Sequence, residues 1–190
     1  MVHIKAKSGY AKASDTYASG RPDYPVEIAG WLAETLGLSA ASTVLDLGAG
    51  TGKFTRFLVD TGAQVIAVEP VDEMRAQLRR YVPGVTTLAG AADDIPLADG
   101  SVDVVVCSQS FHWFATQSAL GEIHRVLRTR GKLGLVWNIR DEKTPWVKSL
   151  SKIMRPSRPE LCACIPENGA RLLRPGCLHR FKNKRFRIPM

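Results

Sequence analysis

Strand-length apolar runs recur five times within the first 140 residues of this 190-residue chain. They are apolar throughout and do not alternate with polar residues, which is typical of strands buried on both faces of a parallel sheet. Segments with helical spacing separate most of them, so the sequence predicts an α/β fold: a three-layer, doubly wound and mostly parallel sheet of at least five strands. The predicted strands are residues 43–47, 64–70, 85–90, 102–109 and 132–138.

Glycine and proline bound the predicted helices. In the first helix, Pro25 occupies the first turn and Gly37 is the expected stop. The apolar positions between Ile28 and Leu36 have the spacing of one helix face. The predicted helices are residues 25–36, 52–62, 71–81, 116–131 and 144–154.

Regular periodicity ends near Met154, where the composition changes abruptly. We therefore predict one domain over residues 1–154, in which residues 1–25 form an N-terminal cap segment. Residues 155–190 are predicted to be a basic, irregular tail, in which only residues 179–188 have the pattern of a further strand. A sheet whose C-terminal strands are missing or irregular has an unpaired edge, which predicts a homodimer through that edge.

The positive charge is concentrated at the C-terminal end. Residues 1–146 hold fifteen Lys and Arg against sixteen Asp and Glu, whereas residues 147–190 hold eleven against two. A near-neutral body argues against an enzyme of nucleic acids; the basic end either touches RNA, DNA or acidic lipid or is simply solvated. The apolar runs are too short to span a bilayer, and the N-terminus lacks the apolar core of a signal peptide, so we expect a cytoplasmic protein without a membrane partner.

The tail contains the one candidate metal cluster, formed by Cys162, Cys164, Cys177 and His179. Thiolate and imidazole groups are ligands that zinc prefers, but the C-x-C and C-x-H spacings differ from the usual C-x-x-C. Cys107 ends an apolar strand and is expected to be a core thiol. No metal site is predicted in the body of the chain.

The sequence DLGAGTG, residues 46–52, forms a glycine-rich turn between a predicted strand and a predicted helix. Such a turn lies at the carboxyl end of the sheet and lets the backbone approach a ligand closely. A dinucleotide turn would require glycine at the position of Lys53. A phosphate-binding Walker loop would require one more residue between Gly48 and Gly52, and Ser or Thr in place of Phe54.

The same residues closely resemble the first signature of class I S-adenosylmethionine (SAM) methyltransferases, and further elements follow in register. VIAVEP and GAADDIPL resemble later elements of that family. SVDVVVCSQSFHWF, together with the Y-x-x-x-R-P-x-Y-P pattern of residues 17–25, is most similar to the methyltransferase type 11 group that contains trans-aconitate methyltransferase-like enzymes. The resemblance implies a Rossmann-like fold, SAM as the cofactor and S-adenosylhomocysteine as the product.

The resemblance also implies a role for each cofactor contact. Glu69 stands where the family places an acidic residue that accepts hydrogen bonds from both ribose hydroxyls, and Asp93 stands where it places a glutamate at the adenine edge. Arg21 either pairs with the SAM carboxylate or is a surface arginine. The full set of expected cofactor-binding residues is Tyr17, Arg21, Asp46, Gly48, Ala49, Gly50, Gly52, Glu69, Pro70, Met74, Ala92, Asp93, Ser108 and Gln109.

On the acceptor side, His112 is the candidate catalytic residue because it follows the predicted strand 102–109 and would face the methyl group. It acts as a base or an orienting donor, or else is a packed histidine. Trp113 and Phe114 line an acceptor pocket or belong to the core. A carboxylate acceptor needs no base, whereas a hydroxyl acceptor does.

Three functions remain open at this point. The first is a SAM-dependent methyltransferase acting on a small-molecule carboxylate or hydroxyl by in-line displacement. The second is a non-catalytic SAM-binding protein with an incomplete acceptor site. The third, an oxidoreductase with a nucleotide cofactor, is disfavoured by Lys53 in the glycine turn.

Overall fold

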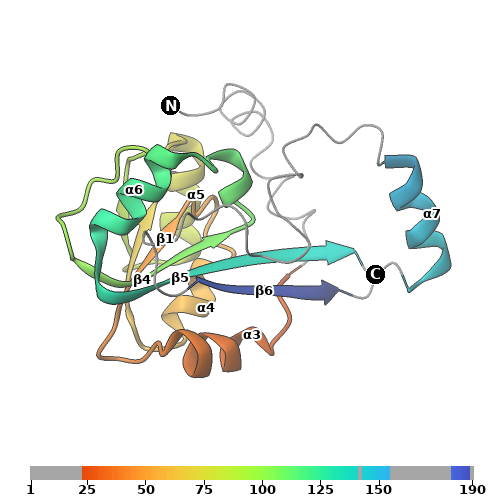
Figure 1. The fold of residues 1–190 in the computed structure, drawn as a ribbon, viewed down its shortest axis with the longest axis horizontal. Coiled ribbons are helices and arrows are strands. Elements are labelled where there is room, and N and C mark those ends of the chain that lie inside the picture. The colour runs from red at the N-terminus through yellow and green to blue at the C-terminus, as the bar shows by residue number, and fades with distance from the viewer. Residues whose placement is uncertain (1–22, 141–142, 155–180, 189–190) are drawn as a thin grey trace.

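A parallel sheet organises the chain in the computed structural model, which describes residues 23–140, 143–154 and 181–188 (Figure 1). Its strands lie in the order β3-β2-β1-β4-β5-β6, and each neighbouring pair is parallel. The predicted α/β, mostly parallel fold is therefore confirmed. The strands are β1 Thr43–Leu47, β2 Gln64–Val68, β3 Thr86–Leu88, β4 Val102–Ser108, β5 Leu127–Arg140 and β6 Phe181–Ile188.

The strand order places the glycine turn at a topological switch point. From β1 the chain proceeds outward to β2 and β3 on one side, and then returns to continue through β4 and β5 on the other. The turns that leave β1 and β4 consequently diverge at the carboxyl ends of these two strands. Folds of this kind bind ligands in a crevice at that position, and we use the word crevice for it.

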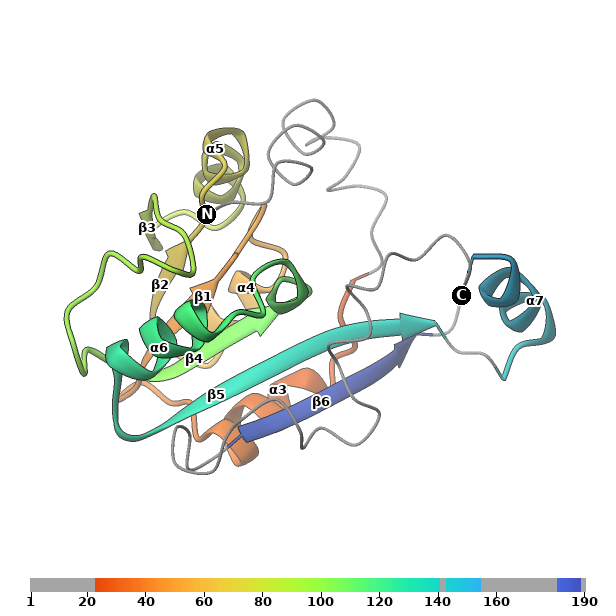
Figure 2. The ribbon, with the colours of Figure 1, turned by 45° about the horizontal axis from the view of Figure 1, so that its top comes forward.

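Helices cover both faces of the sheet. Figures 1 and 2 show α6 on one face and α3 and α4 on the other, while α7 lies apart, beyond the carboxyl ends of β5 and β6. The helical elements are α3 Ile28–Gly30, η1 Trp31–Leu36, α4 Thr55–Val59, α5 Asp72–Tyr81, η2 Phe111–Trp113, α6 Gln117–Val126 and α7 Pro145–Met154.

The first predicted helix forms as a short α-helical turn that continues as a π-helix. Gly37 ends it in the left-handed conformation, with φ 76°, as the sequence predicts. The Lys132 ammonium group donates hydrogen bonds to the carbonyl oxygens of Thr35 and Leu36, at 3.0 and 2.9 Å. This cation satisfies carbonyl groups that the helix end leaves without an internal partner.

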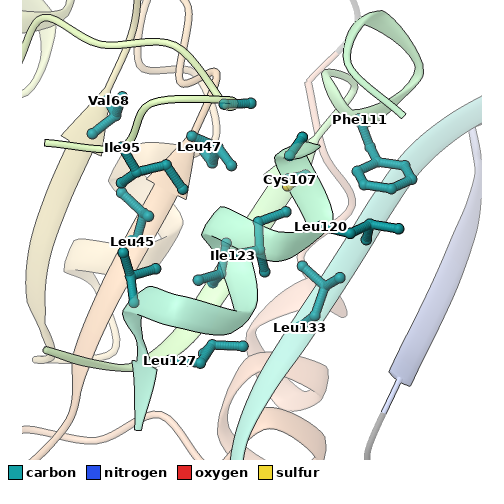
Figure 3. Packing of buried hydrophobic residues seen from close by; sticks show 14 of the residues in the cluster. Leu45, Leu47, Val68, Ile95, Cys107, Phe111, Leu120, Ile123, Leu127 and Leu133 are labelled. Carbon is teal, nitrogen blue, oxygen red and sulfur yellow. The ribbon is translucent and has the colours of Figure 1, made fainter. Parts of the chain in front are cut away.

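Two hydrophobic clusters hold the layers together, one on each face of the sheet. Figure 3 shows the cluster beneath α6, in which Ile123 lies among side chains of the strands. The opposite cluster packs Leu32 and Leu36 of η1 against the central strands. Ile123 and Leu32 are fully buried, so both faces are closed to water, as expected for a sheet of apolar strands.

The helix predicted over residues 116–131 is too long by five residues at its C-terminal end. It ends at Val126, because Leu127 already pairs with Val102 as the first residue of β5. The pairing then shifts register, so that Lys132 faces Val104. Arg130 adopts a positive φ of 67° in the intervening bulge.

The additional strand that the sequence predicts within the tail is present as β6, parallel to β5. The division into one domain and a tail stays a prediction, because residues 1–22 and 155–180 lie outside the described part. The zinc candidates Cys162, Cys164, Cys177 and His179 lie there as well.

Replacing Ile123 by Ala should lower the free energy of unfolding by about 2–5 kcal/mol, since the substitution leaves a cavity in a closed cluster. Ile123→Val is the matched control and should cost about 0.5–1.5 kcal/mol. Urea unfolding followed by circular dichroism measures both. Equal losses for the two variants would contradict the close packing of this cluster.

Candidate functional site

Three glycines with left-handed backbone angles shape the turn between β1 and α4. Gly48, Gly50 and Gly52 have φ values of 73°, 59° and 86°. Their surroundings differ: a methyl group added at Gly48 would lie 2.7 Å from Ser110 Cβ, whereas one added at Gly50 would have Met74 Sδ, at 3.9 Å, as its nearest neighbour. Gly48 is therefore enclosed by protein, whereas Gly50 borders space that no described side chain fills.

The Glu69 carboxylate fixes this turn from the end of β2. Its Oε2 accepts a hydrogen bond from the backbone N–H of Gly50, and its Oε1 accepts one from the N–H of Val71, both at 2.9 Å. Arg75 donates to the Glu69 carbonyl oxygen at 2.7 Å. Burial raises the pKa of Glu69, while the two backbone hydrogen bonds oppose that rise.

Asp46 lies fully buried near the end of β1, beneath the turn. Thr55 of α4 donates its hydroxyl hydrogen to Oδ2 at 2.7 Å. Among the described residues, no donor reaches the buried Oδ1 atom. Burial raises the pKa of Asp46 from 3.8 to about 7, against the Thr55 hydrogen bond and helped by the nearby Glu69 charge.

The loop after β3 closes the β2 side of the site. Gly90 is so close to Val68 and Pro96 that an added methyl group would lie 3.1 Å from Val68 Cγ1 and 2.6 Å from Pro96 Cδ. Ala92 is buried in the cluster beneath α6, whereas Asp93 is exposed. On the adjacent turn, Pro70 is half-buried, and Met74 of α5 is buried.

The chain after β4 forms the other wall. Gln109 has a positive φ of 53°, and its side-chain amide donates to the carbonyl oxygen of Asn138 at 3.1 Å. Ser110 donates to the carbonyl oxygen of Leu47 at 2.7 Å, which joins this wall to the end of β1. His112 lies in η2, half-buried, with its ring 5.1 Å from that of Trp113.

A tyrosine from the N-terminal segment reaches this wall. The Tyr24 hydroxyl shares a hydrogen bond with the Ser108 hydroxyl, at the carboxyl end of β4. The Tyr24 ring packs edge-on against Phe54, with centroids 4.9 Å apart. Tyr17 and Arg21, the other residues expected from this segment, lie outside the described residues.

The structure thus groups the expected residues of the central strands around one crevice, and adds several that the motifs did not single out. Four residues each hold a backbone or side-chain group of the crevice through the hydrogen bonds described above: Thr55, Arg75, Ser110 and Tyr24. Tyr24 stood within the R-P-x-Y-P pattern. The other three occupy ordinary helix or loop positions, so only the tertiary structure identifies them.

Comparison with known proteins agrees with this geometry. Residues 45–135 match the methyltransferase domain family model Methyltransf_11. An uncharacterized methyltransferase-like protein of Schizosaccharomyces pombe is 44% identical over 90% of this chain and 66% of its own length. An uncharacterized methyltransferase of Mycobacterium tuberculosis is 48% identical over 76% of this chain and 58% of its own.

Solved structures give the same result. A SAM-dependent methyltransferase from Aquifex aeolicus matches with a TM-score of 0.51 and 25% identity, over 60% of this chain and 68% of that one. The chain belongs to the class I SAM-dependent methyltransferases. The YcgJ protein of Bacillus subtilis matches with a TM-score of 0.54 and 25% identity, over 70% and 59% of the two chains.

The chain spans less than two thirds of the length of the curated relatives reported above. The trans-aconitate methyltransferase-like group, which the sequence resembles, stays a prediction. Within the described residues, no helix is long and apolar enough to cross a membrane, and no cluster of His, Cys, Asp or Glu could hold a metal ion.

Substitution by alanine should have different effects on SAM binding and on stability at the different glycines of this turn. Gly50→Ala should abolish SAM binding yet cost only the left-handed backbone strain of about 1–2 kcal/mol. Gly48→Ala should lose further stability through its collision with Ser110. Gly84, with φ 87° and no described neighbour within 4 Å of an added methyl, is the strain-matched control and should retain SAM binding. Thermal unfolding and calorimetry measure the two effects, and SAM binding by Gly50→Ala at wild-type affinity would contradict the assignment.

Asp46 should make the protein less stable as the pH rises. Between about pH 4 and pH 7, the folded protein binds more protons at Asp46 than the unfolded chain does, so the free energy of unfolding falls across this window. Three pKa units correspond to an upper bound of about 4 kcal/mol. Asp46→Asn should flatten the slope in urea unfolding between pH 4.5 and 8, and identical slopes would exclude Asp46 as its source.

Proposed function

We propose that this protein binds SAM in the crevice above β1 and β4 and transfers its methyl group to a small-molecule carboxylate or hydroxyl. The observation that carries the proposal is the pairing of an open glycine turn with a buried acid. Gly50 borders space that no described side chain fills, and Glu69 lies beside that space with both carboxylate oxygens in place.

The residues present fit this cofactor. Each carboxylate oxygen of Glu69 has two lone pairs and accepts one hydrogen bond from a backbone N–H group. A further acceptor position therefore remains on each oxygen for a ribose hydroxyl. The buried Oδ1 of Asp46 is a second acceptor without a donor among the described residues. In this proposal, Pro70 and Met74 border the adenine, and Ala92 and Asp93 meet its edge.

When bound, SAM supplies an electrophilic methyl group on a sulfonium ion. The chain then has to orient the acceptor, exclude water and, for a hydroxyl acceptor, remove a proton. In this proposal, Ser108 and Gln109 contact the cofactor, and His112, which follows them on the same wall, orients the acceptor or accepts its proton. Trp113 and Phe114, half-buried beside it, provide an apolar lining.

A carboxylate is the first acceptor class to examine. The malonyl-[acyl-carrier protein] O-methyltransferase of Methylococcus capsulatus is 38% identical over 47% of this chain and 35% of its own length. A carboxylate is already a nucleophile at neutral pH, so it requires positioning but no base. His112→Ala should therefore lower turnover far more if the acceptor is a hydroxyl than if it is a carboxylate.

Calorimetry with SAM, S-adenosylhomocysteine and NAD tests the cofactor, and turnover on a panel of small carboxylic acids and phenols tests the activity. Binding of the two SAM-type ligands with methyl transfer to a panel member supports the proposal. Binding without turnover favours the alternative, a non-catalytic SAM-binding protein. Binding of NAD alone overturns both.

The edge strands β3 and β6 give the predicted homodimer two candidate surfaces, and sedimentation tests that prediction.

Glu69→Ala should weaken SAM binding by about 1.5–3 kcal/mol, the range for hydrogen bonds to a charged group. Glu73→Ala, which removes an exposed carboxylate from the first turn of α5, is the matched control and should bind normally. Calorimetry gives both affinities, and unfolding curves without ligand reveal any separate loss of stability. An unchanged affinity in Glu69→Ala would remove this residue from the site.

A further inference from the structure

Two charged side chains of α6 bind the backbone of the loop that follows β3. Glu122 Oε2 accepts a hydrogen bond from the Ile95 N–H at 2.9 Å. Arg125 donates to the carbonyl oxygens of Ile95 and Leu97, at 2.9 and 2.8 Å. The pair thus satisfies both the donor and an acceptor of Ile95, as a neighbouring strand would, in a loop that has no strand partner at this point.

The two side chains also fix each other. Arg125 contacts both carboxylate oxygens of Glu122, at 2.7 and 2.8 Å, in the two-pronged geometry that makes arginine–carboxylate pairs strong and directional. A third contact, at 2.7 Å, joins Arg125 to Asp99. Hydrogen bonding to Arg125 lowers the pKa of Glu122 to about 2, so the pair stays ionised at ordinary pH.

The loop held in this way is the one that borders the crevice beside Glu69. Gly90 is packed against Val68, the last residue of β2, and Ala92 and Ile95 are buried in the cluster beneath α6. Figure 3 shows Ile95 close to Val68 and Leu47 in this cluster. Asp93 lies between these two buried positions and is exposed, in a turn closed by a hydrogen bond from the Asp94 N–H to the Ala91 carbonyl oxygen at 3.2 Å. The backbone that follows this turn is the part that the two α6 side chains anchor.

We propose that Glu122 and Arg125 are positioning residues for adenine recognition, which they control by holding the backbone that presents Asp93. The proposal rests on SAM binding as proposed above, with Asp93 accepting a hydrogen bond from the adenine amino group. Neither α6 residue touches the cofactor in this arrangement. Their effect should therefore fall on discrimination between bases, because the glycine turn and Glu69 hold the rest of the cofactor independently.

The experiment compares two ligands that differ only at this contact: S-adenosylhomocysteine and its analogue in which unsubstituted purine replaces adenine. The analogue has a hydrogen atom where adenine has its amino group and keeps the N1 acceptor, so it offers Asp93 no amino donor. The wild-type protein should bind S-adenosylhomocysteine at least about tenfold more tightly, the scale of one hydrogen bond to a charged group. The ratio of the two dissociation constants is the readout, because a general loss of folded protein affects both ligands equally.

Arg125→Met should reduce that ratio to about threefold or less. Arg125→Lys should not restore it, because one ammonium group cannot reproduce the forked contacts. Arg128→Met is the matched control: Arg128 makes an ion pair of the same 2.7 Å length with Asp103, towards the amino end of β4, and its loss should leave the ratio unchanged. If Arg125→Met does not fold, Glu122→Gln, which keeps an acceptor for Ile95 but loses the charge, tests the same contact.

Each outcome is decisive. A ratio that falls in the α6 variants and persists in Arg128→Met supports the inference. A wild-type ratio that persists in Arg125→Met and Glu122→Gln overturns it, and so does a wild-type protein that binds both ligands equally, while SAM binding itself stands in either case. A protein that binds neither ligand removes the proposed function together with the inference.

Discussion

The Glu69 carboxylate joins the turns that follow β1 and β2, and the geometry of the crevice depends on this one connection. Its two oxygens accept the backbone N–H groups of Gly50 and Val71, so the glycine turn cannot move without breaking a hydrogen bond to a buried acid. An unpaired carboxylate in this environment would carry a large desolvation cost. The acid therefore stabilises the turn, and the hydrogen bonds from the turn offset the desolvation cost of burying the acid.

Around this connection, apolar and polar groups occupy different levels of the fold. The strands are closed on both faces by side chains such as Leu32 and Ile123, which supply most of the stability through burial. The polar groups gather where the strands end, and several of them bind backbone of a neighbouring turn: Ser110 to Leu47, Arg75 to Glu69, and Glu122 to Ile95. The rigid layers thus fix the positions of irregular loops, and the loops hold the chemical groups.

The sequence was sufficient for the layers and for the central motif, because both depend on local patterns. Continuous apolar runs predicted the parallel strands, and DLGAGTG predicted a ligand-binding turn with three glycines in unusual conformations. It was not sufficient for the end of α6, because the helical pattern continues past Val126 while pairing with Val102 converts the chain to a strand. Nor did it identify Arg125 or Thr55, because a helical pattern does not specify the loop carbonyl groups or the buried acid to which their side chains bond. The roles of Asp93 and His112 stay predictions, because the motifs locate these two residues but their contacts depend on the bound molecules.

The bulge between α6 and the regular part of β5 lies at the end of the sheet opposite the glycine turn. Arg128, Thr129 and Arg130 are exposed there, at the amino end of β4, while the crevice lies at the carboxyl ends of the strands. Regular pairing with β4 resumes at Lys132, which faces Val104. This end of the molecule is consequently the natural place to attach a fluorescent label or a surface tether, because it lies at the opposite end of the strands from the glycine turn.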